Sequence, residues 1–136
     1  MKKISVLLLF SLAVSGSLQA QTTFQHFYGE ADRDIPQAII QTSDGGYAVT
    51  GNAIDAVGVD DDASLLRVDD LGNVLWYYAY GGVSRDLASG VIETSDGGFV
   101  IGGQTASFGT GGDIFLLKVD TSGSPVWGKT IGGAMV

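Results

Sequence analysis

Three consecutive carboxylates, Asp60, Asp61 and Asp62, form the densest cluster of potential ligands in this chain of 136 residues. Calcium takes oxygen ligands from flexible loops, so this cluster could hold a calcium ion. The spacing departs from the alternating acidic pattern of an EF-hand loop. Only the third carboxylate recurs in a similar stretch 51 residues later, as Asp113. The alternative is that Asp62 serves the entry of a strand, and that Asp60 and Asp61 are merely solvated.

Aromatic side chains form a second candidate site at Tyr77, Tyr78 and Tyr80. Aromatic rings offer a ligand a large apolar face with a polar edge, and this run is more aromatic than its counterpart further along the chain. We therefore predict a patch here that faces a protein or polysaccharide ligand. Trp76 and Trp127 occupy matching places in the two stretches. They could form a sugar-binding platform, but we expect a structural role in packing between repeated units.

Several aspartates stand where tight turns need them. The segments 43–46 and 95–98 both read Ser-Asp-Gly-Gly, which places a hydroxyl beside a carboxylate as in an activated nucleophile. However, Asp-Gly between two apolar runs is typical of a β-hairpin, whose primed turns need positive φ angles. A carboxylate before an x-x-Gly turn usually accepts bonds from backbone amides. We therefore expect structural roles for Asp44, Gly45, Asp96, Gly97, Asp69 and Asp120.

An Arg-Asp pair also occurs twice, as Arg33-Asp34 and Arg85-Asp86, shortly before the first apolar run of each similar stretch. These charged side chains could bind a ligand at one end of the fold. Alternatively, they could form ion pairs between neighbouring units, which is the role we expect.

The remaining composition excludes several kinds of chemistry. The chain has one histidine, His26, and no cysteine, which rules out a zinc site or a Cys/His dyad within one chain. It contains no P-loop, no G-x-S-x-G elbow and no dinucleotide fingerprint. We therefore expect that the chain is not an enzyme.

The elements that must position these residues come in two copies. Residues 28–54 match residues 80–106 at 11 of 27 positions with an offset of 52, and residues 62–82 match residues 113–133 at 9 of 21 with an offset of 51. A period of about fifty residues is the signature of a repeat architecture, in which one unit cannot bury its apolar face alone.

Each copy contains four short runs with the composition of β-strands. The predicted strands are 38–42, 47–51, 63–68 and 74–80, and then 90–94, 99–103, 114–119 and 126–131. Apart from the N-terminal segment, no stretch shows the 3.6-residue period of an amphipathic helix. The predicted fold is all-β, with two four-stranded antiparallel blades of an incomplete β-propeller. A β-solenoid is the competing architecture.

The sequence patterns resemble a known family of repeats. The order T-S-D-G-G-[YF]-x-[VI]-x-G, then L-L-[RK]-V-D-x-x-G-x-x-x-W, then G-G is similar to the blade repeat of secreted and cell-surface β-propeller proteins of bacteria and archaea. Residues 68–76 and 119–127 also resemble the tryptophan-docking blade of quinoprotein-like, WD40-like propellers. The resemblance covers residues 24–133 and implies the architecture. It carries no functional residue across, because propellers host many activities.

The N-terminal 20 residues have the features of a cleaved signal peptide, with two lysines, an apolar stretch and an ending of small and polar residues. An uncleaved anchor is the alternative. Export would place the chain in the periplasm, on the cell surface or outside the cell, with no membrane insertion after cleavage. The remaining residues 21–136 carry 5 basic and 15 acidic side chains, a formal charge of −10. This charge disfavours binding to nucleic acid.

These features predict four segments. They are the signal peptide 1–20, a leading strand 21–30 of the fourth-strand type, a first blade 31–82, and a second blade 83–136 that ends in the start of a linker. We expect a non-catalytic scaffold for binding or adhesion, forming the N-terminal part of a larger surface or secreted protein. Its partners would then be further blades of that chain or other copies. The alternatives are the propeller segment of a secreted hydrolase and an obligate oligomer of two-blade chains.

Overall fold

The computed structural model describes residues 25–29, 34–54 and 61–133, so the expected signal peptide, Asp60 and Arg33 lie outside the described residues. Within these ranges the chain forms strands and no helix, and therefore no helix long and apolar enough to span a membrane. The strands are β1 (Asp34–Gln41), β2 (Tyr47–Ile54), β3 (Asp61–Val68), β4 (Val74–Tyr80), β5 (Asp86–Glu93), β6 (Phe99–Thr105), β7 (Asp113–Val119) and β8 (Pro125–Ile131).

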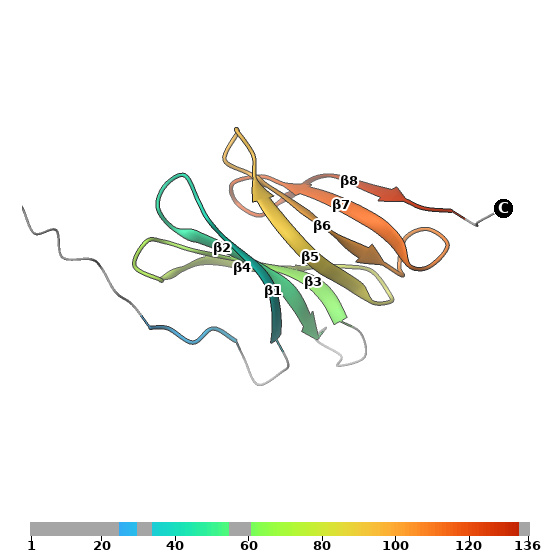
Figure 1. Cartoon of the computed structure of the whole chain (residues 1–136), viewed down its shortest axis with the longest axis horizontal. Helices are drawn as coiled ribbons and strands as arrows, with labels where there is room; N and C mark the ends of the chain where they lie inside the picture. Colours follow the sequence, from blue (N-terminus) through green and yellow to red (C-terminus); the bar gives the residue numbers. More distant parts are fainter. Residues whose placement is uncertain (1–24, 30–33, 55–60, 134–136) are drawn as a thin grey trace, which may run out of the picture.

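The strands form two separate four-stranded sheets, which confirms the predicted all-β fold with two antiparallel four-stranded units. The order is β1-β2-β3-β4 in the first sheet and β5-β6-β7-β8 in the second, so each sheet is an up-and-down meander with two free edges (Figure 1). The first strand of each sheet begins four residues earlier than predicted. A register shift between Pro36 and Ala38, and again between Ala88 and Gly90, lets the strand continue past an irregularity.

The hairpin turns differ in detail from the expected primed turns. In the first turn, the Thr42 amide donates to the Gly46 carbonyl at 2.9 Å and the Gly45 amide donates back to the Thr42 carbonyl at 2.9 Å. Positive φ occurs at Gly45 (91°) and at its counterpart Gly97 (78°), whereas no described residue other than glycine has positive φ. The aspartate before each glycine therefore keeps an ordinary conformation, and its carboxylate is free to serve the turn by hydrogen bonding.

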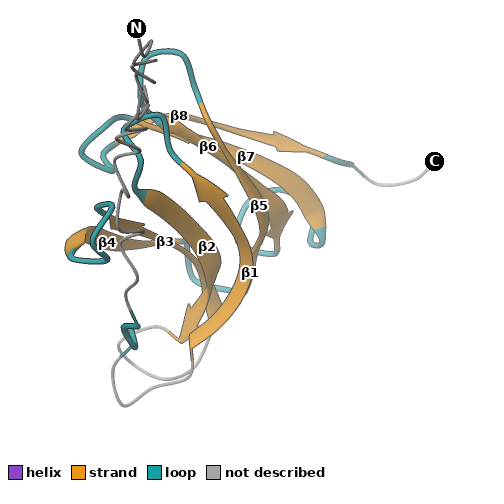
Figure 2. Cartoon of the chain, turned by 60° about the vertical axis from the view of Figure 1, so that its left-hand side comes forward, coloured by secondary structure: helices purple, strands orange, loops and turns teal. Residues whose placement is uncertain are grey.

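The hydrophobic core lies between the two sheets. β5, the first strand of the second sheet, contacts β1, β2 and β3, so the inner end of the second sheet lies across a face of the first (Figure 2). Alternate residues of a strand point to opposite faces, so a strand at this interface gives one set of its side chains to the core. The buried members are Ala48, Ala63, Leu65, Ala88, Val91, Phe99, Ile101 and Val119.

The two outermost faces have no sheet packed against them among the described residues. On the second sheet, all seven residues of β8 are exposed, and Ile92 and Ile114 are 61% and 57% exposed. We call this face the outer flank; its side chains are Ile92, Val100, Ile114, Leu116 and Trp127. On the first sheet, residues 25–29 partly cover the opposite face, although they belong to no β-ladder of the described chain.

Candidate functional site

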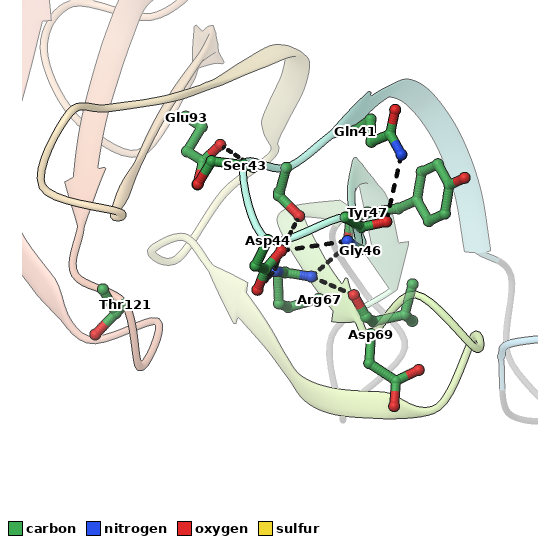
Figure 3. Close-up of polar contacts among 12 residues, drawn as sticks. Gln41, Ser43, Asp44, Gly46, Tyr47, Arg67, Asp69, Glu93 and Thr121 are labelled. Carbon is green, nitrogen blue, oxygen red and sulfur yellow. Dashed lines mark hydrogen bonds and ion pairs between the residues drawn. The ribbon is translucent and has the colours of Figure 1, made fainter.

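Asp44 and Arg67 form the centre of a polar cluster at the first hairpin turn (Figure 3). Two hydrogen bonds of 2.6 and 2.5 Å run from Arg67 Nη2 to the two carboxylate oxygens of Asp44. The Arg67 side chain is only 6% exposed, and its Nη1 also donates to the carbonyls of Tyr47 and Val68. The hydroxyl of Thr42, together with a backbone amide and Arg67, lowers the pKa of the Asp44 carboxyl. This cluster therefore ties the β1–β2 turn to the end of β3.

The same cluster recurs at the second hairpin, with lysine in place of arginine. Lys118 Nζ lies 2.9 Å from Asp96 Oδ1 and donates to the Val119 carbonyl at 3.0 Å. The Thr94 hydroxyl donates to Asp96 at 2.5 Å, and this bond is the largest of the effects that lower the pKa of the Asp96 carboxyl. Because the geometry matches, Asp44 and Asp96 both stabilise a hairpin turn.

Asp69 and Asp120 organise the turns that lead into the fourth strand of each sheet. Asp69 Oδ1 accepts the backbone amide of Asn73 at 2.7 Å, and Oδ2 accepts the Asn73 side chain at 2.8 Å. Asp120 Oδ1 accepts the amides of Ser122 and Ser124 at 2.8 and 2.9 Å. Hydrogen bonds lower the pKa of both carboxyls. The largest effect comes from the Asn73 side chain for Asp69 and from the Ser122 hydroxyl for Asp120.

The acidic segment that suggested calcium contributes a contact between the sheets. Asp61 is buried, and its Oδ2 lies 3.0 Å from Arg85 Nη2 in the linker before β5. This is the ion pair between units that the sequence suggested for Arg85. The adjacent Asp62 points to the opposite face of β3, because side chains alternate. Among the residues described, no three His, Cys, Asp or Glu side chains are grouped as a metal site would need, so calcium stays a sequence prediction.

The three tyrosines do not form one patch. Tyr80 and Tyr78 share the face of β4 that looks toward the second sheet, and the Tyr80 hydroxyl donates to the Gly123 carbonyl at 2.8 Å. Burial, followed by the nearby charges of Tyr78 and Asp120, raises the pKa of Tyr80. Tyr77 points to the other face and is 44% exposed. The alternation of side chains along β4 therefore separates residues that are adjacent in sequence.

The two tryptophans occupy equivalent positions in different surroundings. Trp76 Nε1 donates to the Thr121 carbonyl at 3.1 Å, and its ring meets the Phe99 ring edge-on at a centroid distance of 5.9 Å. Trp76 therefore packs between the sheets. Trp127 lies on the outer flank, 41% exposed, with Lys129 Nζ 5.8 Å from the ring centroid.

A groove of about 710 Å³ lies between residues 25–29 and the first sheet. Its walls are mainly apolar. Phe27 and Tyr28 form one side, while Val49, Leu66 and Tyr77 on the face of the sheet form the other. The groove combines concavity with several aromatic side chains, so we take it as the candidate binding site.

The face of the first sheet that lines the groove corresponds, in the second repeat, to a face that is buried between the sheets. Val49 and Leu66 match Ile101 and Leu117 of the second sheet, which belong to or pack against the core between the sheets. The neighbouring Ile39 is 64% exposed, whereas Val91, its equivalent 52 residues later, is 7% exposed. The first sheet thus presents the same type of face that the second sheet buries.

Tyr28 reproduces a contact made elsewhere in the structure. Its hydroxyl donates to the Gly72 carbonyl at 2.7 Å, just as Tyr80 donates to Gly123. Burial and the charge of Asp69 raise the pKa of Tyr28. Tyr28 precedes Tyr80 by 52 residues and Gly72 precedes Gly123 by 51. Residues 25–29 therefore lie against the first sheet as the end of β4 lies against the second.

Sequence reasoning did not identify three other contacts between the sheets. Ser43 donates through its amide and its hydroxyl to the Glu93 carboxylate, at 2.7 and 2.8 Å. The Ala88 amide donates to Asn52 Oδ1 at 2.8 Å. Each contact involves a residue that differs between the two repeats. Glu93 of the second repeat corresponds to a glutamine in the first, and Asn52 of the first repeat corresponds to a glutamine in the second. A search for recurring residues could not find them.

Asp86 is a buried carboxylate that organises the linker between the sheets. It accepts the Gly82 amide at 2.8 Å and the Ser107 hydroxyl at 2.6 Å, and the Thr105 hydroxyl also donates to it. The recurrence of the Arg-Asp pair was the available signal for this residue.

No family model matches the sequence, and no curated protein is significantly similar to it.

Proposed function

We propose that this chain is a non-catalytic, exported scaffold of the β-propeller type, whose blades stack side by side and whose exposed flanks bind other molecules. The observation that carries the proposal is the repeated contact of a tyrosine hydroxyl with the turn of the next sheet, Tyr28 with Gly72 and Tyr80 with Gly123. A contact that recurs with the sequence period is what stacked repeat units require, because each unit meets only its neighbours.

The hydrogen bonds and ion pairs that the polar side chains form support a structural, scaffolding function. The acidic residues that recur between the repeats bond to turn amides, to a neighbouring hydroxyl or to a basic side chain of the same sheet, as for Asp44 with Arg67 and Asp96 with Lys118. Asp61 and Arg85 join one sheet to the next. These groups stabilise turns and contacts between sheets, which is the role that a scaffold needs.

The exposed flanks support a role in binding. Large apolar patches on a soluble surface usually mark interaction sites, and the outer flank carries exposed apolar side chains at Ile92, Ile114 and Trp127. An indole ring with an ammonium group above it suits a polysaccharide or a protein surface. The net charge of the expected mature chain points away from nucleic acid.

Binding without turnover can be measured on the purified chain. We expect saturable co-sedimentation with isolated cell envelopes or envelope polysaccharides, and no release of reducing ends or peptides. Trp127→Ala should weaken retention, whereas Val126→Ala, at an exposed position beside it, should leave retention unchanged. Product formation, or the absence of saturable retention, would contradict the proposal.

A further inference from the structure

One carboxylate of the groove differs in its surroundings from its counterpart in the second repeat. Asp34 and Asp86 are equivalent, 52 residues apart, and each begins the first strand of its sheet. Asp86 is 2% exposed and accepts hydrogen bonds from two side-chain hydroxyls and a backbone amide. Asp34 is exposed and lines the groove. The carboxylate that is satisfied within the second sheet is therefore presented to the groove in the first.

A difference across the β-ladder accounts for part of this change. In the second sheet, Asp86 pairs with Thr105, whose hydroxyl donates to the carboxylate. In the first sheet, Asp34 pairs with Ala53, which has no polar side-chain atom and also lines the groove. The Asp34 carboxylate can therefore accept a hydrogen bond from a ligand where Asp86 accepts one from Thr105.

The rest of the groove lining is mainly apolar and aromatic. The rings of Phe27, Tyr28 and Tyr77 line it, and its volume of about 710 Å³ lies within the range of about 300–1,000 Å³ that small ligands occupy. The hydroxyls of Tyr28 and Thr50 already donate to backbone carbonyls, both at 2.7 Å. Among the described residues of the lining, Asp34 is the only one with a formal charge at neutral pH.

We propose that the groove binds a small organic cation, namely an amine with an apolar or aromatic body. The ammonium group donates hydrogen bonds to Asp34, and the body packs among Phe27, Tyr28 and Tyr77. Aromatic rings attract ammonium groups to their faces, so the rings and the carboxylate favour the same ligand charge. The formal charge of −10 on residues 21–136 also attracts cations at longer range. This ligand site is separate from the outer flank, on which the proposed retention by envelopes depends.

Other small ligands match the lining less well. An anion would meet the Asp34 carboxylate and the negative faces of the rings. A neutral sugar brings many hydroxyls, and the hydroxyls of Tyr28 and Thr50 are already used within the protein. An apolar molecule would remove water from the carboxylate without supplying a hydrogen-bond donor, which is costly. An amine supplies both the donor and the opposite charge.

The test titrates the full-length chain with three probes of similar shape and follows the signals of labelled tyrosine rings by NMR. The probes are phenethylamine, its neutral analogue phenethyl alcohol and the anionic hydrocinnamate. We expect the amine to bind saturably, at least about threefold more tightly than the alcohol, because an exposed ion pair is a modest interaction. Added salt should narrow this difference. Hydrocinnamate should bind more weakly than the alcohol. An amine that binds no more tightly than the alcohol would overturn the proposal.

Variants of the chain locate the bound amine. Asp34→Asn should weaken amine binding at least about threefold and leave alcohol binding unchanged. Asp70→Asn is the matched control, because it makes the same charge change at an exposed aspartate outside the groove. Tyr77→Leu should weaken the binding of both probes, since it removes a ring from the wall. Equal effects of Asp34→Asn and Asp70→Asn would overturn the proposal in favour of nonspecific attraction to an acidic chain.

Ala53→Thr tests the comparison between the repeats. It places a hydroxyl opposite Asp34, as Thr105 lies opposite Asp86 in the second sheet. Ala53→Val is the matched control, because valine has a similar shape and no hydroxyl. We expect Ala53→Thr to weaken amine binding more than Ala53→Val does, with circular dichroism confirming that both variants fold. Equal amine binding by the two variants would overturn the assignment of Asp34 as the acceptor.

Amine binding and envelope retention can fail separately. Amine binding without retention on envelopes would overturn the proposed scaffold function alone. Retention that Trp127→Ala weakens, in a chain that does not bind phenethylamine, would overturn the amine site alone.

Discussion

At the scale of single residues, equivalent positions of the two repeats have different energetic roles. Trp76 and Trp127 are both tryptophans after the same turn, yet Trp76 donates a hydrogen bond into the second sheet while Trp127 is 41% exposed. The difference arises because a sheet packs against one of them and not against the other in the described chain. Identical side chains in a repeat therefore provide natural pairs of test and control.

Trp76→Ala should lower the free energy of unfolding by about 2–4 kcal/mol, because it leaves a cavity against Phe99 and removes the bond to Thr121. Trp127→Ala should lower it by less than about 1 kcal/mol, as for most exposed positions. Urea titrations of both variants measure the difference. Equal losses would mean that the two rings have similar surroundings.

Asp44→Ala should destabilise the chain by about 1–2 kcal/mol, because it leaves the buried guanidinium of Arg67 without its carboxylate. This figure allows for the 63% exposure of the Asp44 side chain, which screens the ion pair. Asp70→Ala, at an exposed aspartate of the neighbouring turn, serves as the control and should change stability little. A loss as large in the control would show that net charge, rather than the ion pair, is responsible.

At the scale of elements, the turns depend on glycine conformation. Gly97 has a φ of 78°, and a Cβ built there meets a methyl group of Thr121 at 3.2 Å. Gly97→Ala should therefore cost about 1–2 kcal/mol of unfolding free energy. Gly90→Ala is the control, because that Cβ meets nothing within 4 Å, and alanine also restricts the unfolded chain. Thermal unfolding that lowers the melting temperature equally in both variants would contradict the turn geometry.

The same turns should make the chain sensitive to acid. The pKa values of the Asp44, Asp69, Asp96 and Asp120 carboxyls are lowered in the folded state by hydrogen bonds within the turns. A lowered folded pKa gives stability that is complete above the unfolded value of about 3.9 and is lost as the pH falls through the folded value. We expect the melting temperature to decline below about pH 4, and the decline to be shallower in Asp69→Asn/Asp120→Asn. An unchanged slope in that variant would contradict this assignment.

The sequence predicted the strands well because two strong signals coincided. Turn motifs marked the ends of the hairpins, and the apolar runs between them recurred at a fixed offset. The early starts of β1 and β5 were missed, because a register shift lets a strand continue where its pattern is broken. Positive φ was expected in the Asp-Gly turns and is found at the glycines alone.

The candidate site was predicted less well, for a physical reason. Tyr77, Tyr78 and Tyr80 were grouped by their closeness in sequence, but alternation along β4 sends Tyr77 to the groove and the others toward the second sheet. Contacts such as Ser43 with Glu93 depend on how two sheets meet, and the first repeat carries Gln41 where the second carries Glu93. Tyr28 was the exception, because its match to Tyr80 at an offset of 52 was visible in the sequence.

At the scale of the whole molecule, the two outer faces of the pair of stacked sheets differ from each other. The groove side carries a partial substitute for a neighbouring strand, and the outer side exposes the equivalents of residues that are buried in the first sheet. Ile114 is 57% exposed where Ala63 is fully buried. These unlike flanks are what the proposed stacking of blades requires, since each sheet meets its two neighbours through different faces.

The central claim is that residues 25–29 lie against the first sheet as β4 lies against the second. NMR of the full chain with labelled tyrosine tests it most directly, through nuclear Overhauser contacts from each ring to the turn it faces. The account predicts contacts from Tyr28 to residues 71–73 and matching contacts from Tyr80 to residues 122–124, with both hydroxyl protons slow to exchange. Contacts from Tyr80 alone, with Tyr28 showing the shifts of an unstructured residue, would contradict the account.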